Sequence, residues 1–343
     1  MEEINIDTGY KKSKIVIGES IANLRDYIPG NKKTVIITDT NIHDLYNQYM
    51  KKFPVIITQP GETKKTLDSV KDIYRQLIEL EVDRHSYVVA VGGGIVCDMA
   101  GFAASTFLRG IGFGFVSTTL LSQVDASVGG KNGVNLDGYK NMIGVFNQPD
   151  FVICDLTMLQ TLDNREYRAG FAEIIKAAAI KSKTLFSMLS SSAEKALSRD
   201  TATLLPLIKE SVLIKAAIVN EDEKEAGTRK LLNFGHTFAH GIEKLTGIVH
   251  GEAVAIGMVM AALLSVKKKL LSPGNADNLI SLIAEYNLPV KIEINPAELF
   301  QAMKKDKKRE TMHVDFILLD DIGKGTIVPI NLKEMEELIH DLC

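Results

Sequence analysis

Residues 87–104 read YVVAVGGGIVCDMAGFAA, and this stretch decides the fold class. Its first five residues form the apolar, β-branched run of a strand that is buried on both faces. Gly92, Gly93 and Gly94 follow, and the remaining residues can form a helix. Glycines at this turn let the backbone approach a pyrophosphate, which the N-terminus of the helix would then bind. Because Cys97 breaks the G-x-G-x-x-G spacing, a plain tight turn between strand and helix is the alternative.

The sequence on either side of this stretch repeats the strand and helix pattern. Helical stretches such as residues 66–80 lie between short β-branched runs. This alternation predicts a Rossmann-like, doubly wound α/β domain with a mostly parallel sheet. The predicted strands cover residues 14–17, 34–38, 55–58, 87–91, 114–117 and 151–154.

From about Asn164 onward the pattern is mainly helical. It predicts a bundle, followed by a small strand pair at residues 315–319 and 326–328 and a last helix from Lys333. We therefore expect an α/β domain over residues 1–162 and a mainly α-helical domain over residues 163–343. The predicted helices of the bundle cover residues 166–181, 201–220, 230–245, 251–270 and 275–286.

Composition limits the classes of function. The 343 residues are 45% hydrophobic and 24% charged, which is typical of a soluble globular protein. A formal net charge of -3 gives no general attraction for nucleic acid or for an anionic membrane. The longest apolar run, residues 253–264, is shorter than a bilayer span, and the N-terminus lacks an apolar signal core. Three widely spaced cysteines argue against a disulfide framework and against a cysteine zinc site. We expect a cytoplasmic protein with no nucleic-acid or membrane partner.

Polar residues follow two other predicted strands. Asp39 and Asn41 come directly after residues 34–38, and Glu62 and Lys65 come after residues 55–58. A doubly wound sheet binds its ligands at the carboxyl ends of its strands, where carboxylates often accept hydrogen bonds from ribose hydroxyls. These residues are therefore expected to line a nucleotide site.

Residues 118–141, TTLLSQVDASVGGKNGVNLDGYKN, are rich in small, polar and cationic side chains. A glycine pair before Lys131, with Lys140 and Asn141 beyond it, suits a phosphate or a carboxylate. The Walker pattern is not met, so an ATPase is disfavoured. A solvated surface loop is the alternative interpretation.

Three of the seven histidines lie in residues 229–251, RKLLNFGHTFAHGIEKLTGIVHG. His236 and His240 are four residues apart and would share one helix face, while His250 follows the break at Thr246 and Gly247. Imidazoles in this pattern, with a carboxylate, suit a divalent metal such as zinc. Histidines satisfied by the backbone are the alternative.

Glu173 is the candidate carboxylate, because it lies in the apolar helical stretch AGFAEIIK. A carboxylate buried there is costly unless it is paired or bound to metal. A buried ion pair with Lys176 is the alternative. Arg229, Asn233 and His236 are expected on neighbouring parts of one helix surface, with Lys215 and Glu225 preceding them.

Taken together, these segments make the chain resemble the 3-dehydroquinate synthases of the shikimate pathway, within the sugar-phosphate cyclase superfamily. The resemblance spans nearly the whole chain through eleven motifs in sequence order: DTN, PGE-x-x-K, GGG-x-x-x-D, TFLRG, TTLLSQVDASVGGK, KN, GFAEIIK, K-x13-R, LLNFGHTFAH, HGEAVAIG and DKK. Ala239 and Cys97 stand where glycines are commoner in the family, and Cys97 is expected to affect the affinity for NAD rather than binding itself.

The resemblance implies a homodimer that binds NAD in its first domain and one divalent metal per subunit, zinc or alternatively cobalt, in its second. It implies Glu173, His236 and His250 as the metal ligands. The implied NAD contacts are Asp39, Asn41, Glu62, Lys65, Gly93, Gly94, Ile95, Asp98, Thr118, Thr119, Lys131, Lys140, Thr161, Leu162 and Glu166. The implied catalytic and substrate contacts are Arg109, Asp125, Lys131, Lys140, Asn141, Lys176, Lys215, Glu225, Arg229, Asn233, His240 and Lys307, and Arg109 would reach the partner subunit's site.

The family's reaction would convert 3-deoxy-D-arabino-heptulosonate 7-phosphate (DAHP) into 3-dehydroquinate and phosphate. It combines transient oxidation by NAD, elimination of phosphate, re-reduction and an intramolecular aldol closure, so the enzyme is a carbon–oxygen lyase. The alternatives are another sugar-phosphate cyclase, a metal-dependent polyol dehydrogenase and a non-catalytic NAD or metal sensor. Arg229, Lys215 and Lys307 favour a substrate that carries a carboxylate as well as a phosphate.

Overall fold

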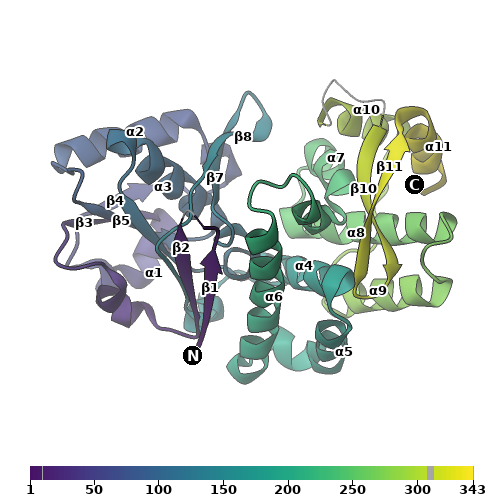
Figure 1. The fold of residues 1–343 in the computed structure, drawn as a ribbon, viewed down its shortest axis with the longest axis horizontal. Coiled ribbons are helices and arrows are strands. Elements are labelled where there is room, and N and C mark those ends of the chain that lie inside the picture. The colour runs from purple at the N-terminus through teal and green to yellow at the C-terminus, as the bar shows by residue number, and fades with distance from the viewer. Residues whose placement is uncertain (10, 307–312, 343) are drawn as a thin grey trace. The chain divides into compact units, whose positions relative to one another are not determined.

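The structure is a computed structural model that describes residues 1–9, 11–306 and 313–342. The chain forms two compact units (Figure 1). The first comprises Met1–Leu162 and Lys215–Lys224, and the second comprises Asp163–Ile214 and Glu225–Cys343. The sequence pattern placed residues 215–224 in the second domain, but they belong to the first unit.

The first unit is built on a seven-stranded sheet with the strand order β1-β2-β9-β6-β5-β3-β4. β1 and β2 pair antiparallel, and all the other neighbours are parallel. This is the predicted doubly wound architecture, and all six predicted strands are present. The strands are β1 (Glu2–Asp7), β2 (Lys12–Ile17), β3 (Thr34–Asp39), β4 (Val55–Thr58), β5 (Tyr87–Gly92), β6 (Gly112–Ser117) and β9 (Phe151–Cys154).

β5 shows why the sheet is covered on both faces. All six of its residues are buried. Tyr87, Val89 and Val91 point to one face and join an apolar cluster with Met50 of α1 and Met158 of the turn η5. The intervening residues face the opposite side of the sheet, and α3 also packs on β5. The helical segments of this unit are η1 (Ile21–Tyr27), α1 (Thr40–Met50), η2 (Glu62–Lys64), α2 (Leu67–Glu79), α3 (Gly94–Thr106), η3 (Phe107–Arg109) and η5 (Leu156–Thr161).

Residues 118–141 are not the solvated loop that was the alternative interpretation. They contain a π-helical turn, η4 (Ser122–Ala126), and then β7 (Lys131–Leu136). β7 pairs antiparallel with β8 (Tyr139–Phe146) in a hairpin that the sequence did not predict. β7 also packs on α3, so this segment is anchored to the unit along its length.

The second unit is mainly helical. Figure 1 shows its helices with the antiparallel β10–β11 pair, which packs on α8. Its elements are α4 (Asn164–Lys181), α5 (Lys183–Leu197), α6 (Thr201–Glu221, whose end belongs to the first unit), η6 (Thr228–Asn233), α7 (His236–Thr246), α8 (His250–Lys267), α9 (Pro273–Glu285), α10 (Pro296–Asp306), β10 (His313–Asp321), β11 (Lys324–Asn331) and α11 (Leu332–Leu342).

α8 is the central helix of this unit. By length and composition the whole helix could cross a membrane, although the apolar run 253–264 within it is shorter than a bilayer span. However, 72% of its apolar window is buried inside the structure, as in the core helix of a soluble protein. Small residues bring its neighbours close: a Cβ atom on Gly251 would lie 2.1 Å from the carbonyl oxygen of Ala169 in α4.

The predicted helix over residues 230–245 is wrong at its start. Residues 228–233 form the 3-10 segment η6, and α7 begins only at His236. Gly235 interrupts the two with a left-handed backbone, φ +81°. Arg229, Asn233 and His236 therefore do not lie on one helix surface, and the expectation that they do is corrected.

Candidate functional site

Three predicted ligands meet in the second unit. Glu173 projects from the middle of α4, while His236 and His250 are the first residues of α7 and α8. Glu173 Oε1 lies 3.6 Å from His236 Nε2 and 3.7 Å from His250 Nε2. One ligand atom from each of the three residues lies within 4.8 Å of the others. Two helix starts and one helix middle thus converge on one point.

The backbone around Gly235 explains how His236 is placed. A Cβ atom on Gly235 would lie 2.8 Å from Met258 N and 3.0 Å from Val254 O, both in α8. The turn before α7 can therefore pack directly against the backbone of α8, the helix that carries His250. The left-handed conformation, which glycine adopts without strain, then starts α7 at His236.

Each imidazole has a second partner on its other nitrogen. His236 Nδ1 lies 3.3 Å from the carbonyl oxygen of Phe234, and His250 Nδ1 lies 3.0 Å from Glu243 Oε1. Both oxygens can only accept, so they favour the tautomer that carries the proton on Nδ1 and a lone pair on Nε2. In this tautomer, the one that a metal ligand needs, both Nε2 atoms offer a lone pair to a metal ion beside Glu173.

This buried cluster contains several ionisable side chains. The carboxylate of Glu173 forms an ion pair with Lys176, and both side chains are buried. Burial lowers the pKa of His250, but the neighbouring carboxylates of Glu173 and Glu243 outweigh it and raise that pKa to about 9. The two carboxylates therefore favour a positive charge at His250.

These residues fit a divalent metal ion. Glu173 Oε1 is buried without a hydrogen-bond partner among the described residues, which is costly unless a cation binds it. Zinc bound tetrahedrally at about 2.0–2.2 Å would place its ligand atoms roughly 3.3–3.6 Å apart, close to the separations found. Two imidazoles and a carboxylate leave a fourth position for substrate or water. The Lys176 ion pair, the alternative reading of Glu173, is present as well and uses the other carboxylate oxygen.

His240 lies beside this cluster without joining it. Its ring centroid is 5.7 Å from that of His236, and the rings meet edge to face. The ligand group found among the described residues consists of Glu173, His236 and His250. Nearby in the chain, Asn233 Nδ2 donates to Glu225 Oε1 at 2.5 Å, and Arg229 in η6 is buried. Lys307 lies outside the described residues.

In the first unit, the glycine turn ends β5 and starts α3. A Cβ atom on Gly94 would lie 2.8 Å from Ala126 Cβ, and one on Gly93 would lie 3.0 Å from Thr119 Cγ2. Glycine is thus required for the η4 segment to pack on this turn. Ile95 and Asp98 lie in the first turns of α3, whose N-terminal N–H groups suit an anion. The side chain of Cys97 is fully buried with its Sγ toward Gly92 O, so it packs beneath the turn.

A polar network extends from this turn. Lys65 Nζ lies 2.5 Å from Asp98 Oδ2 and donates to Asn141 Oδ1 at 2.6 Å. Asp39 caps α1 by accepting from Ile42 N, and burial raises the pKa of its carboxyl group. The structure therefore joins predicted nucleotide residues to Asn141, a predicted substrate residue.

The remaining predicted residues are placed as follows. Lys215 Nζ donates to Asp125 Oδ1 at 2.5 Å and to Asp125 O at 2.7 Å, within the first unit. Thr161 shares a hydrogen bond with the Tyr46 hydroxyl. Arg109 is exposed and follows Leu108, and both have left-handed backbones, with φ +71° and +51°. Of the other predicted residues, Glu166 lies in the second unit. The first unit contains Asn41, Glu62, Thr118, Thr119, Lys131, Lys140 and Leu162.

The sequence interpretation missed two residues that contact the predicted sites. Glu243 contacts His250 across the Gly247 break, and Asn135 contacts both Glu62 and Asn141. A buried acid seven residues before His250 was the available signal for Glu243. Asn135 had no signal, because its partners lie 73 and 6 residues away.

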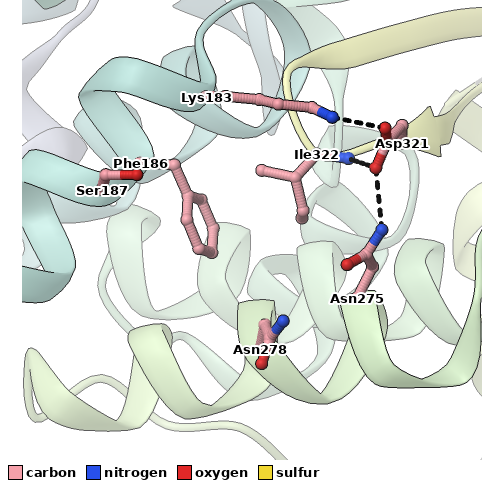
Figure 2. A pocket seen from close by; sticks show the side chains of 7 residues that line it. All are labelled: Lys183, Phe186, Ser187, Asn275, Asn278, Asp321 and Ile322. Carbon is pink, nitrogen blue, oxygen red and sulfur yellow. Dashed lines mark hydrogen bonds and ion pairs between the residues drawn. The ribbon is translucent and has the colours of Figure 1, made fainter.

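A separate surface pocket in the second unit shares no residue with the metal cluster (Figure 2). Lys183 Nζ lies 2.6 Å from Asp321 Oδ2, while Asn275 Nδ2 donates to Asp321 Oδ1 at 2.7 Å. Asp321 accepts from both Lys183 and Asn275, and it thereby ties the end of β10 to α5 and α9. It is a packing feature and not the candidate site.

Comparison with known proteins agrees with this geometry. The model of the 3-dehydroquinate synthase N-terminal domain matches residues 55–169, and that of the C-terminal domain matches residues 170–309. A 3-dehydroquinate synthase of Leptospira interrogans is 40% identical over 353 residues, covering 99% of this chain and 98% of the relative.

Two solved structures share the whole fold. A 2-deoxy-scyllo-inosose synthase, complexed with carbaglucose-6-phosphate, NAD+ and Co2+, has a TM-score of 0.88 and 28% identity, covering 99% of this chain and 100% of that one. The 2-epi-5-epi-valiolone synthase of Streptomyces hygroscopicus subsp. jinggangensis, with NAD+ and Zn2+ bound, has a TM-score of 0.88 and 26% identity, covering 100% and 98%.

The fold and the Glu-His-His cluster define the class as a sugar-phosphate cyclase. Identity is higher to the Leptospira relative than to these two cyclases. Within this class, the chain belongs to the 3-dehydroquinate synthase family. The family expected from the sequence motifs is confirmed.

Proposed function

We propose that this chain converts DAHP into 3-dehydroquinate and inorganic phosphate, a step of aromatic amino-acid biosynthesis. The observation that carries the proposal is the Glu173, His236 and His250 cluster. It stands in a chain 40% identical, over nearly its full length, to a 3-dehydroquinate synthase. The net reaction is that of a lyase.

The two cofactors are NAD and one divalent metal ion, zinc or cobalt, as in the related cyclase structures. When bound, NAD supplies a reversible hydride acceptor and the metal ion polarises substrate hydroxyls. The glycine turn offers the N–H groups of α3 to the pyrophosphate, and Asp39 offers a carboxylate to a ribose. Glu173, His236 and His250 hold the metal ion.

The cationic side chains bind the two acidic groups of the substrate. Lys131, Lys140 and Arg109 suit a phosphate, while Arg229 suits a carboxylate through its planar guanidinium. Charge that develops as phosphate leaves is stabilised by these cations.

Proton transfer is assigned to His240 together with bound water and the phosphate of the substrate. His240 lies beside the metal cluster but is not one of its ligands, so its ring nitrogens are not used for the metal. An imidazole can both accept and donate a proton.

The proposal includes a cytoplasmic homodimer in which Arg109 serves the partner's site. Arg109 is exposed on the strained turn at residues 108–110. Left-handed non-glycine residues cost energy and cluster at functional sites. A conformation that presents this guanidinium outward supports its use by another subunit.

The direct test measures phosphate release with NAD and zinc from DAHP, from glucose 6-phosphate and from a heptose phosphate without the carboxylate. We expect release from DAHP alone, because Arg229 recognises the carboxylate. Release from glucose 6-phosphate instead would indicate another cyclase. Steady NADH production from glycerol would indicate a polyol dehydrogenase, and binding of NAD and zinc without turnover of any substrate would indicate a sensor.

A further inference from the structure

Asn135, near the end of β7, contacts two separate parts of the first unit. Its Nδ2 donates to Glu62 Oε1 at 2.8 Å. Its Oδ1 accepts from the backbone N–H of Asn141 at 2.8 Å. Its own backbone N–H donates to the carbonyl oxygen of Lys65 at 2.9 Å. Asn135 therefore bonds both the segment that precedes α2 and Asn141 in β8.

We propose that Asn135 is a positioning residue that couples nucleotide binding to substrate binding. This inference rests on the proposed function, in which Glu62 and Lys65 contact NAD and Asn141 contacts DAHP. Asn135 itself touches neither ligand in this account. It acts by fixing the residues that do.

The chemistry of the contacts requires an amide at this position. The N–H of Asn141 can only donate, so the atom of Asn135 that faces it is the oxygen. The amide nitrogen then faces Glu62, whose carboxylate can only accept. An aspartate at position 135 would keep the first bond and place a second negative charge against Glu62. No other side chain of this length supplies both a donor and an acceptor.

Asn141 is the residue whose backbone conformation has to be stabilised. Its backbone is left-handed, with φ +52°, a conformation that asparagine adopts more readily than other non-glycine residues but that its contacts still have to select. Two contacts hold it there: Asn135 Oδ1 on its N–H, and Lys65 Nζ on its side-chain oxygen at 2.6 Å. Both contacts lead back to the segment 62–65. A change in Glu62 or Lys65 on NAD binding is thereby passed to Asn141, and the coupling is reciprocal.

The test compares Asn135→Ala and Asn135→Asp with the matched control Asn147→Ala. Asn147 lies just beyond the same hairpin, and its side chain donates to Ser105 Oγ at 2.8 Å, away from this network. Calorimetry gives the NAD dissociation constant, steady-state assays give the KM for DAHP at saturating NAD, and thermal unfolding reports folding.

We expect both Asn135 variants to raise the NAD dissociation constant and the KM for DAHP by about tenfold or more, since the lost bond is to an ionised group. The control should change each by less than about twofold. If Asn135→Ala fails to fold, Asn135→Asp retains the bond to Asn141 and still tests the link to Glu62. Equal changes in the control and the Asn135 variants would overturn the inference.

A double-mutant cycle separates coupling from simple loss of structure. Glu62→Ala removes the acceptor for Asn135 Nδ2 and should raise the KM for DAHP in the parent protein, although Glu62 is not assigned a contact with DAHP. The Glu62 substitution should have little further effect in the Asn135→Ala background, because the hydrogen bond between residues 62 and 135 is already absent there. Additive effects would overturn the coupling. If the parent protein releases no phosphate from DAHP, the proposed function fails, while the NAD dissociation constants still test the bond between Asn135 and Glu62.

Discussion

His250 lies between two buried carboxylates, Glu173 on its Nε2 side and Glu243 on its Nδ1 side. Buried acids are costly, and here two of them face one imidazole. A divalent ion bound by Nε2 gives this arrangement a stabilising charge, while Glu243 keeps the ring in the ligating tautomer. The role of Glu243 is thus to orient a ligand.

At Glu243 we predict a loss of metal affinity without loss of folding. Glu243→Ala should weaken zinc binding roughly 10- to 100-fold, the usual effect of removing an outer partner of a ligand. Glu243→Gln should have a smaller effect because its amide oxygen still accepts from Nδ1. Competition with a chelator of known affinity measures both.

The control for this prediction is Glu252→Gln. Glu252 is an acid in the first turn of the same helix as His250, but it pairs with Arg165 at 2.7 Å. Its substitution should leave zinc affinity unchanged. Equal losses in the Glu243 and Glu252 variants would show that Glu243 has no special role.

The sequence could identify the ligands but not their outer partners. An acid in an apolar helix and histidines at a helix start are visible as residue types in a pattern, which is why Glu173 and His250 were predicted. Glu243 and Asn135 are residues of common types, and only the folded structure shows that they contact the predicted site residues. The sequence offered only the acid seven residues before His250 as a signal for Glu243, and it offered none for Asn135.

Among the elements, α7 depends on its first turn. Gly235 combines a left-handed backbone with close approach to the backbone of α8. Gly247, at the other end of α7, is also left-handed, with φ +68°, but nothing lies within 4 Å of its Cβ position. Substitution of Gly247 therefore tests the cost of the backbone conformation alone, whereas substitution of Gly235 tests that cost together with the cost of overpacking.

We predict that Gly235→Ala lowers the free energy of unfolding by about 2–4 kcal/mol, from strain and overpacking together. Gly247→Ala should lower it by only about 1 kcal/mol, from strain alone. Gly235→Ala should also weaken zinc binding, because His236 is the next residue. Urea unfolding and chelator competition measure these effects. Equal losses of stability at the two glycines would contradict the packing argument.

The break at Gly235 also shows where periodicity misleads. Residues 230–245 keep an apolar helical spacing across the glycine, so the pattern predicted one helix. A glycine inside a helical pattern does not reveal whether its φ is positive. The strands of the sheet were easier to predict, because continuous burial on both faces requires the unbroken apolar runs seen in β5.

In the whole molecule, the predicted nucleotide residues up to Leu162 belong to one unit and the metal ligands to the other. Residues 215–224 belong to the first unit, although α6 begins in the second. The periodicity of a helix does not show which core the helix packs on. The sequence therefore could not predict that residues 215–224 belong to the first unit. Lys215, which is bonded to Asp125, is a predicted substrate residue that lies in this part of the first unit.

A mixing experiment tests whether the proposed dimer shares its sites. Arg109→Ala and Lys131→Ala chains should each be nearly inactive alone. In a mixed dimer, one site combines an intact Lys131 with the partner's intact arginine, so an equal mixture should recover about a quarter of the parent activity. Absence of recovery in confirmed heterodimers would place Arg109 in its own subunit's site.

The central claim is that NAD is used and regenerated within each turnover. The most direct measurement follows phosphate and NADH together, with zinc-loaded protein, excess DAHP and a limiting amount of NAD. The account predicts that phosphate released exceeds the NAD present many-fold while no NADH accumulates. Phosphate release that stops at one equivalent per NAD, or NADH that rises in step with phosphate, would contradict it.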